Sequence, residues 1–221
     1  MRRYLYIETD GMLYLVKRED RWTLPLEEAD RERIPFEFEL KATLRVQGHE
    51  VVYCVPRLNH HPRDWHPKDE IPGRDDVDPL VRLAVHYTLP RVVAEALITR
   101  EEDVLLVKPS RGFNRGMWTL PGGFVAYGES PAEAVGREVE EEVGAPCRVG
   151  KLLGVYSFVG KESSYTWHMF AYEAEVLGEE FHPAADEIEA VRWVPLSEAC
   201  SLLHGIKRRI LFDHLASKLS Q

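Results

Sequence analysis

The sequence predicts an α/β (α+β) protein in which a small β-rich N-terminal domain, residues 1–89, precedes a domain of strands and helices, residues 90–221. Three observations predict this organisation. In residues 1–56, Tyr and Val alternate with charged residues over short segments, as in strands with one solvent-exposed face. The stretch of about 57–79 is dense in Pro, Asp and His without periodicity, which is typical of a loop or linker. The remaining residues combine strand-like segments with one sharply bounded helix.

The strand-like segments of the N-terminal domain are separated by turn signals at Asp10-Gly11 and Gln47-Gly48. They are residues 4–7, 12–17, 36–46 and 50–55. After a short helix or turn, the second domain continues with further strand-like segments and ends in a helical stretch interrupted near Gly205. In order, these elements are residues 79–87, 92–98, 104–107, 117–120, 151–159, 165–176, 190–196 and 197–219. We expect Pro121-Gly122-Gly123 to interrupt all regular structure.

Composition excludes several classes of function. A formal net charge of -9 argues against gripping nucleic-acid backbones, which takes clustered Lys and Arg, and a polyphosphate ligand would need metal ions between itself and the protein. Cys54, Cys147 and Cys200 are odd in number and far apart, so they support neither a disulfide framework nor a zinc ribbon. No stretch approaches the roughly 20 apolar residues of a membrane helix. We therefore expect a cytoplasmic protein without nucleic-acid or membrane partners.

The clearest element is a helix over residues 130–144. Ser130 is a good N-cap, Pro131 suits the first helical position, and Glu133 completes a Ser-x-x-Glu capping box. Gly144 followed by Pro146 supplies the stop. The apolar face expected to pack on a sheet consists of Ala132, Gly136, Val139 and Val143.

Three carboxylates, Glu138, Glu141 and Glu142, crowd one strip of this helix within a single turn. Most Glu-rich helices simply present a solvated acidic face. Here, however, glycines just upstream can turn a backbone carbonyl toward a metal ion, and Glu129 and Arg137 can pair across the helix start. All candidate ligand atoms are oxygens, which favours Mg²⁺ or Mn²⁺ over zinc.

The stretch 123–145 resembles the Nudix box, G-x5-E-x7-R-E-U-x-E-E-x-G-U, where U is an aliphatic residue. The one departure is a small residue at the last aliphatic position. The matching residues are Gly123, Glu129, Arg137, Glu138, Val139, Glu141, Glu142, Gly144 and Ala145. The resemblance implies the Nudix fold, a mixed β-sheet sandwiched between helices. It also implies Mg²⁺-dependent hydrolysis of a nucleoside diphosphate linked to another group.

Carried over by position, the resemblance implies that Glu138, Glu141 and Glu142 are metal ligands, with the Gly122 or Gly123 carbonyl as a backbone ligand, and that Arg137 is a positioning residue. The general base is expected to be Glu138 or Glu142. A further catalytic or metal-binding acid is expected in the late acidic loop, where we choose Glu187 over Asp186 and Glu189.

Weaker signals come from the loop before the box, where Arg111 and Arg115 are candidate phosphate contacts. Phe113, Trp118, Tyr156 and Trp167 could stack on a base, although aromatic residues in strands more often belong to the core. We interpret His60, His61, Asp64 and His66 as an ordinary polar loop.

The sequence leaves three functions open. The first is a pyrophosphohydrolase acting on ADP-ribose, a nucleotide sugar or a dinucleotide, with a homodimer as one arrangement. The second is a ligand-sensing, non-catalytic Nudix regulator, which is disfavoured because all the box carboxylates are retained. The third is a Nudix-fold isomerase.

Overall fold

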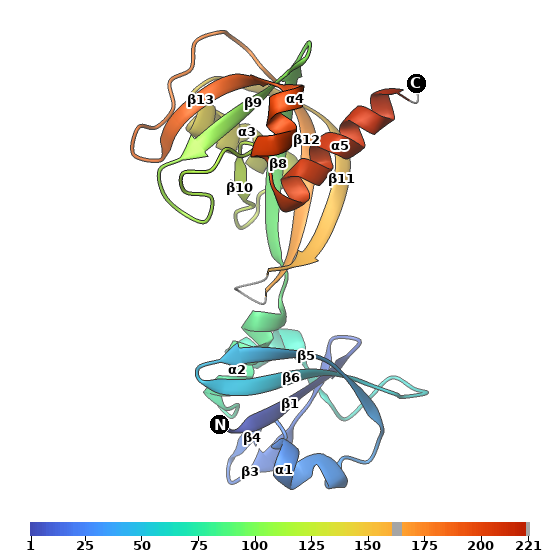
Figure 1. Cartoon of the computed structure of the whole chain (residues 1–221). Helices are drawn as coiled ribbons and strands as arrows, with labels where there is room; N and C mark the ends of the chain where they lie inside the picture. The colour runs from blue at the N-terminus through green and yellow to red at the C-terminus, as the bar shows by residue number, and fades with distance from the viewer. Residues whose placement is uncertain (161–164, 220–221) are drawn as a thin grey trace. The chain divides into compact units, whose positions relative to one another are not determined.

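The computed structural model describes residues 1–160 and 165–219. The chain divides into two compact units, Met1–Pro90 and a second made of Arg91–Gly160 and the residues from Thr166 onward (Figure 1). Within the described residues, no helix has the length and apolar character that a membrane crossing requires.

The N-terminal unit is built around a sheet in the order β5-β6-β1-β2-β7, beside a hairpin of β3 and β4. In this sheet β1 runs parallel to β6, and the other pairs are antiparallel. The elements are β1 (Arg3–Thr9), β2 (Met12–Tyr14), β3 (Val16–Arg18), β4 (Arg21–Thr23), α1 (Glu27–Asp30), η1 (Arg31–Arg33), β5 (Phe38–Val46), β6 (His49–Pro56), β7 (His66–Pro67), η2 (Lys68–Gly73) and α2 (Pro79–Thr88).

Part of the stretch interpreted as a loop or linker, residues 57–79, belongs to the core of the N-terminal unit. Strand β7 pairs with β2, and the side chains of Ile71 and Val77 are fully buried in the same cluster as Tyr6 and Leu13. The linker interpretation is therefore wrong for residues 66–77. Two buried apolar side chains among many polar ones show no periodicity, so composition alone conceals them.

The second unit contains a mixed sheet in the order β11-β12-β8-β9-β13, with β10 also paired to β8. Strand β12 runs parallel to β8 and the other pairs are antiparallel, as expected for the predicted fold. The elements are β8 (Arg91–Arg100), β9 (Asp103–Pro109), β10 (Gly122–Phe124), α3 (Pro131–Val143), β11 (Cys147–Val159), β12 (Thr166–Val176), β13 (Ile188–Pro195), α4 (Leu196–Leu202) and α5 (Gly205–Leu219).

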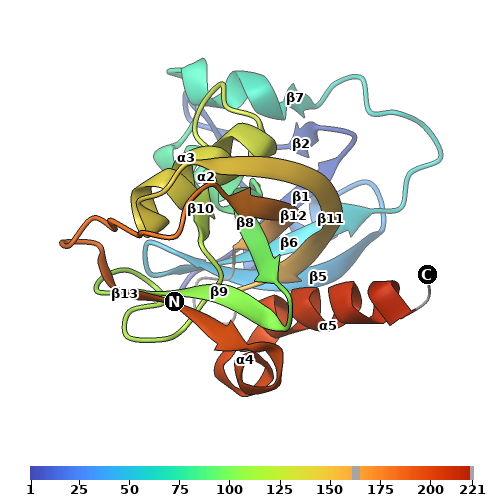
Figure 2. The same ribbon diagram turned by 90° about the horizontal axis from the view of Figure 1, so that it is seen from above.

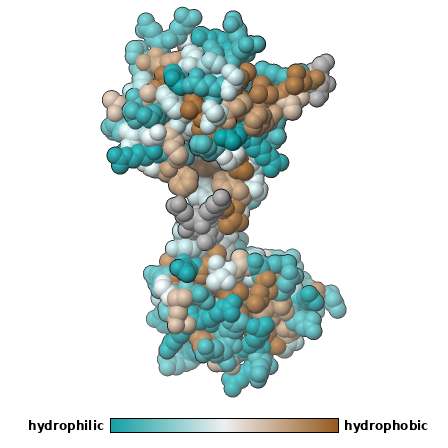
Figure 3. Space-filling model, in the orientation of Figure 1, coloured by the Kyte–Doolittle hydropathy of each residue, from teal (hydrophilic) through white to brown (hydrophobic). Residues whose placement is uncertain are grey.

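Helices cover both faces of this sheet, as Figure 2 shows for α3 on one side and for α4 and α5 on the other. The face under α3 uses Ala94, Ala96 and Ile98 of β8, whereas the opposite face uses Val93 and Leu97 of the same strand. The predicted sandwich of a mixed sheet between helices is therefore confirmed. The outer side of α5 carries apolar residues that reach the surface (Figure 3).

The predicted caps of α3 are confirmed. The Ser130 and Glu133 side chains form the capping box, and Gly144 ends the helix in the left-handed region with φ 73°. The predicted packing face is only half right, because Val139 and Val143 are buried but Ala132 and Gly136 are not. The other fully buried residues of the helix are Ala134 and Val135. The helix is thus rotated from the position that the wheel suggested.

Two local predictions before α3 are wrong. Residues 117–120 form no strand beyond an isolated bridge between Thr119 and Val107. The Pro121–Gly123 stretch does not interrupt all regular structure, because Gly122 to Phe124 form β10. Turn-forming residues were placed in a strand by pairing with β8, a contact between segments distant in sequence.

Candidate functional site

The pairing of β10 with β8 places the glycines of the box. Strand β8 pairs with β9 only at Thr99 and Arg100, so its earlier part accepts β10, and Gly122 lies opposite Glu95. The Pro121 carbonyl accepts a hydrogen bond from the Ala96 N–H at 2.8 Å. Because successive residues of a strand face opposite sides, the N–H and C=O of Gly122 point away from β8. That N–H donates to Glu142 Oε2 at 2.9 Å.

A side chain on either glycine would collide with a neighbour. A Cβ on Gly122 would lie 2.7 Å from Glu95 Cα, and one on Gly123 would lie 2.6 Å from Glu138 Cδ. Gly122 requires glycine because backbone is in the way, whereas a side chain on Gly123 would displace the Glu138 carboxylate. By contrast, the nearest atom to a Cβ on Gly136 is a methyl carbon of Val149 at 3.8 Å, so this position has room for a methyl group.

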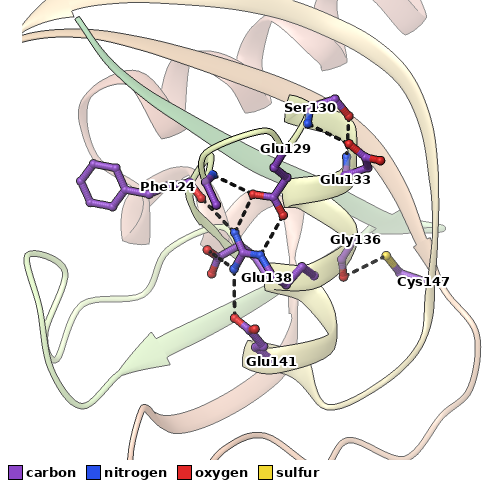
Figure 4. Close-up of polar contacts among 10 residues, drawn as sticks. Phe124, Glu129, Ser130, Glu133, Gly136, Glu138, Glu141 and Cys147 are labelled. Atoms are coloured by element: carbon purple, nitrogen blue, oxygen red, sulfur yellow. Dashed lines mark hydrogen bonds and ion pairs between the residues drawn. The ribbon is translucent and has the colours of Figure 1, made fainter. Parts of the chain in front are cut away.

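Arg137 connects the box loop to the helix by bonds to Phe124, Glu129, Glu138 and Glu141, the partners labelled in Figure 4. Its guanidinium donates to both carboxylate oxygens of Glu129, at 2.9 and 3.1 Å, and to the Phe124 carbonyl at 2.9 Å. It also donates to Glu138 Oε1 at 2.8 Å and Glu141 Oε2 at 3.1 Å. Glu129 in turn accepts from the Ala126 N–H at 2.8 Å. The planar fork of Arg suits this task because one side chain serves several acceptors at fixed angles.

The carboxylates of this region have perturbed pKa values. Burial raises the pKa of Glu142 to about 8, with nearby Glu95 and Glu138 adding to the effect and the Gly122 N–H opposing it. Burial also raises the pKa of Glu138, against the opposing effect of Arg137. The Arg137 and Ala126 donors hold the pKa of Glu129 below its ordinary value. Burial thus outweighs the nearby positive charge at Glu138 and Glu142, whereas Arg137 compensates the charge of Glu129.

A further carboxylate, Glu95, was missed by the sequence analysis. It lies in β8 and is 3% exposed, and Lys207 Nζ of α5 contacts its Oε1 at 3.0 Å. The same Nζ donates to Thr119 Oγ1 at 2.6 Å. The signal that could have found it is a single acid inside the otherwise apolar run Val92–Ile98, since Glu is almost never fully buried without a partner.

The structure places the late acidic loop against the loop that precedes the box. The side chain of Glu187 is paired with Arg111, and its backbone carbonyl accepts from the Ser110 N–H at 2.8 Å. Glu189 is paired with Lys108 at 2.8 Å. These contacts bring Glu187 to a candidate phosphate contact rather than to the box carboxylates, and its catalytic role stays a prediction.

The candidate substrate contacts differ in exposure. Phe113 is 87% exposed and Arg115 is also exposed, so both are free to meet a ligand. Trp118 instead packs against the core under α5, and the Arg192 guanidinium lies 4.7 Å from its ring centroid.

Of the other aromatic candidates, Tyr156 donates to Asp213 at 3.0 Å and packs on the same core. Trp167 lies 5.6 Å from Phe124, between ring centroids. The Phe124 ring points away from the polar cluster (Figure 4), which makes Phe124 a base-stacking candidate that the sequence analysis did not name.

Two histidines of the N-terminal unit, His61 and His66, have separate partners. His66 lies against the Trp22 ring at 4.3 Å between centroids and contacts Arg74 at 2.8 Å, while His61 contacts Asp10 at 3.3 Å. In the part of the chain that the structure describes, no group of three His, Cys, Asp or Glu side chains is already arranged around a metal position.

The donor set near the box nevertheless fits a hard divalent cation. All candidate donors are carboxylate or carbonyl oxygens, the chemistry that Mg²⁺ prefers. Among the described residues, Oε2 of Glu95 is buried without a hydrogen-bond partner, and a buried anionic oxygen without one is costly. Arg137 contacts one oxygen each of Glu138 and Glu141, so a cation at these carboxylates would share them with the guanidinium.

Two named relatives each match about half of the chain. A 36% identity over 104 residues links the chain to an ADP-ribose pyrophosphatase from Methanocaldococcus jannaschii, covering 47% of this chain and 62% of the relative. A 35% identity over 124 residues links it to the NAD-capped RNA hydrolase NudC from Pseudomonas syringae pv. tomato, covering 55% and 43%. The chain thus spans less than two thirds of the length of these relatives.

Similarity to a solved structure indicates the same family. A MutT NUDIX hydrolase from Burkholderia pseudomallei is similar with a TM-score of 0.52 and 32% identity, over 57% of this chain and 98% of that one. The family model of the NUDIX domain matches residues 89–214, which is more than half of the chain and contains the whole box. The chain therefore belongs to the Nudix hydrolase family.

Proposed function

We propose that this protein is a Mg²⁺-dependent pyrophosphohydrolase that cleaves a phosphoanhydride bond in a nucleoside diphosphate linked to another group. The observation that carries the proposal is the placement of Gly122 by β10 beside the buried carboxylate of Glu142, with Glu138 packed against Gly123. Backbone and side-chain oxygens thereby converge at one end of β10. Family membership and the names of the two relatives support the same reaction class.

The residues that would hold the cation are Glu138, Glu141, Glu142 and the carbonyl of Gly122. Strand pairing favours Gly122 over Gly123 as the backbone ligand, because Gly122 directs its carbonyl away from β8 and Gly123 directs its own toward β8. When bound, Mg²⁺ would neutralise the diphosphate and activate water for attack at phosphorus. Arg137 keeps the box loop on the helix and so orients Glu138.

The general base remains a choice between Glu138 and Glu142. One oxygen of Glu138 is held by Arg137, and one oxygen of Glu142 is held by the Gly122 N–H. Burial raises the pKa of both carboxyl groups in the metal-free protein, and a bound cation would lower both, so the two residues stay equal candidates for the base.

ADP-ribose, a nucleotide sugar or a dinucleotide is the proposed substrate class. One relative is named an ADP-ribose pyrophosphatase, and the other is named for its action on NAD-capped RNA. For this chain, Phe113 and Arg115 are exposed in the loop before the box, and Phe124 follows the glycines directly. We propose that these side chains contact parts of the substrate beyond its diphosphate.

The test is a Mg²⁺-dependent turnover screen over nucleoside triphosphates, ADP-ribose, nucleotide sugars, dinucleotides and dinucleoside polyphosphates. We expect phosphoanhydride cleavage that drops at least about a hundredfold in Glu142→Gln, the loss typical of removing a metal ligand or base. Glu140→Gln is the matched control, because Glu140 is exposed on the same helix. Nucleotide binding without turnover would instead establish the sensing regulator.

A further inference from the structure

Glu95 is a buried acid whose charge is only partly compensated. Its side chain is 5% exposed, and it sits in a strand between the apolar residues Val93 and Leu97, which face the same core. Removing a carboxylate from water is costly unless hydrogen bonds and opposite charge replace the lost hydration. Such a residue therefore either finds partners or takes up a proton, and burial does raise the pKa of Glu95 in the metal-free protein.

Lys207 supplies a partner for one oxygen only. Its Nζ contacts Oε1 of Glu95 at 3.0 Å and is held in place by Thr119. Oε2 of Glu95 is equally buried, yet no hydrogen-bond donor reaches it among the described residues. The burial of Lys207, which is 14% exposed, fixes the pair and leaves this second oxygen as a preformed acceptor.

The uncompensated oxygen belongs to the surroundings of the box. Glu95 lies opposite Gly122 in the sheet, and its Cα would be 2.7 Å from a Cβ on that glycine. Its charge acts on Glu142, while the charge of Glu138 acts on both. Within this cluster Arg137 donates to Glu138, and the same guanidinium also serves Glu129, Glu141 and the Phe124 carbonyl, so its charge is shared.

We propose that Glu95 is an additional ligand residue of the divalent-cation site, with Oε2 as the ligand oxygen and Lys207 as the residue that positions it. The proposal rests on the proposed function, since it assumes that the box binds a divalent cation. It adds a carboxylate from β8, outside the box, to the oxygens of α3 and β10. The cation would satisfy the one buried oxygen that Lys207 leaves free.

The test is a calorimetric titration of the full chain with Mn²⁺ in the absence of substrate. We expect Glu95→Gln to weaken Mn²⁺ binding at least about tenfold, as when a ligand or its close support is lost. Glu8→Gln is the matched control, since Glu8 forms the comparably buried pair with Lys68 in the N-terminal unit, at 2.8 Å. Its affinity should stay within about twofold of wild type.

Wild-type binding with an unchanged affinity in folded Glu95→Gln would overturn the ligand role and leave the proposed function standing. No binding by wild type would instead remove the proposed function itself. A second variant, Lys207→Met, tests whether Lys207 positions the ligand oxygen. Because the variant removes the contact that holds Oε1 of Glu95, the increase in melting temperature on adding Mn²⁺ should be smaller than in wild type. An equal or larger increase would contradict the positioning role.

Discussion

The guanidinium of Arg137 is expected to stabilise the second unit through its geometry and not only through its charge. Arg137→Met removes the donors that serve Glu129, Glu138 and the Phe124 carbonyl. Arg137→Lys keeps the positive charge, but its three N–H donors sit on one nitrogen, which cannot reach both sides of the loop. Comparing the two variants therefore separates the contribution of the positive charge of Arg137 from that of its planar geometry.

The expected loss in the free energy of unfolding follows from the solvent exposure of Arg137 and its partners. Glu129 and Glu138 are each 15% exposed, whereas Arg137 is 35% exposed, so solvent screens part of each interaction. A hydrogen bond to a charged group contributes about 1.5–3 kcal/mol when well shielded, and exposed ion pairs contribute about 0.2–1 kcal/mol. We expect a loss of about 2 kcal/mol in the free energy of unfolding for Arg137→Met and about 1 kcal/mol for Arg137→Lys.

The assay is urea unfolding of the metal-free protein followed by tryptophan fluorescence, with Arg148→Met as control. Arg148 is exposed and forms a single ion pair with Glu175 in the same unit, so its variant should lose less than about 0.5 kcal/mol. If Arg137→Lys were as stable as wild type, or if Arg137→Met matched the control, the reasoning from the shared guanidinium would be refuted.

Three other outcomes follow from the same site. Gly123→Ala should reduce Mn²⁺ affinity and turnover, because its Cβ would lie 2.6 Å from Glu138 Cδ. Gly136→Ala is the control and should leave stability unchanged or raise it by about 0.5–1 kcal/mol. Equal Mn²⁺ affinities of the two variants in a titration would argue against the close approach of Gly123 to Glu138. Folding raises the pKa of Glu142 from 4.5 to about 8, so the folded protein binds the extra proton, and the unfolding free energy of the metal-free protein should fall as pH rises from about 5 to 8; an unaltered pH profile in Glu142→Gln would contradict this. Ser130→Ala should cost about 1 kcal/mol in thermal unfolding by removing the capping box, and no loss would show that the cap is dispensable.

Local order was readable from the sequence because its causes lie within a few residues. The ends of α3 depend on Ser130, Glu133 and Gly144, each acting on backbone groups at most four positions away. The same is true of the spacing of the box carboxylates along one helix. These features indicated the element, the family and the reaction class before any tertiary contact was known.

The surroundings of the carboxylates depended on contacts between distant segments. Pairing of β10 with β8 turned a Pro-Gly-Gly stretch into a strand and gave Gly122 its orientation. The rotation of α3 was set by packing on the sheet, so Ala134 was buried in place of Ala132.

The sequence by itself determined which residue types stand at which local spacing. The tertiary structure decided which of those side chains lie close together. Glu95 and Lys207 lie more than a hundred positions apart, and no local pattern joins them. Their pairing arises because α5 packs on the face of the sheet from which the β8 carboxylate emerges. Burial then determines which charges remain uncompensated, and burial is a property of the folded chain alone.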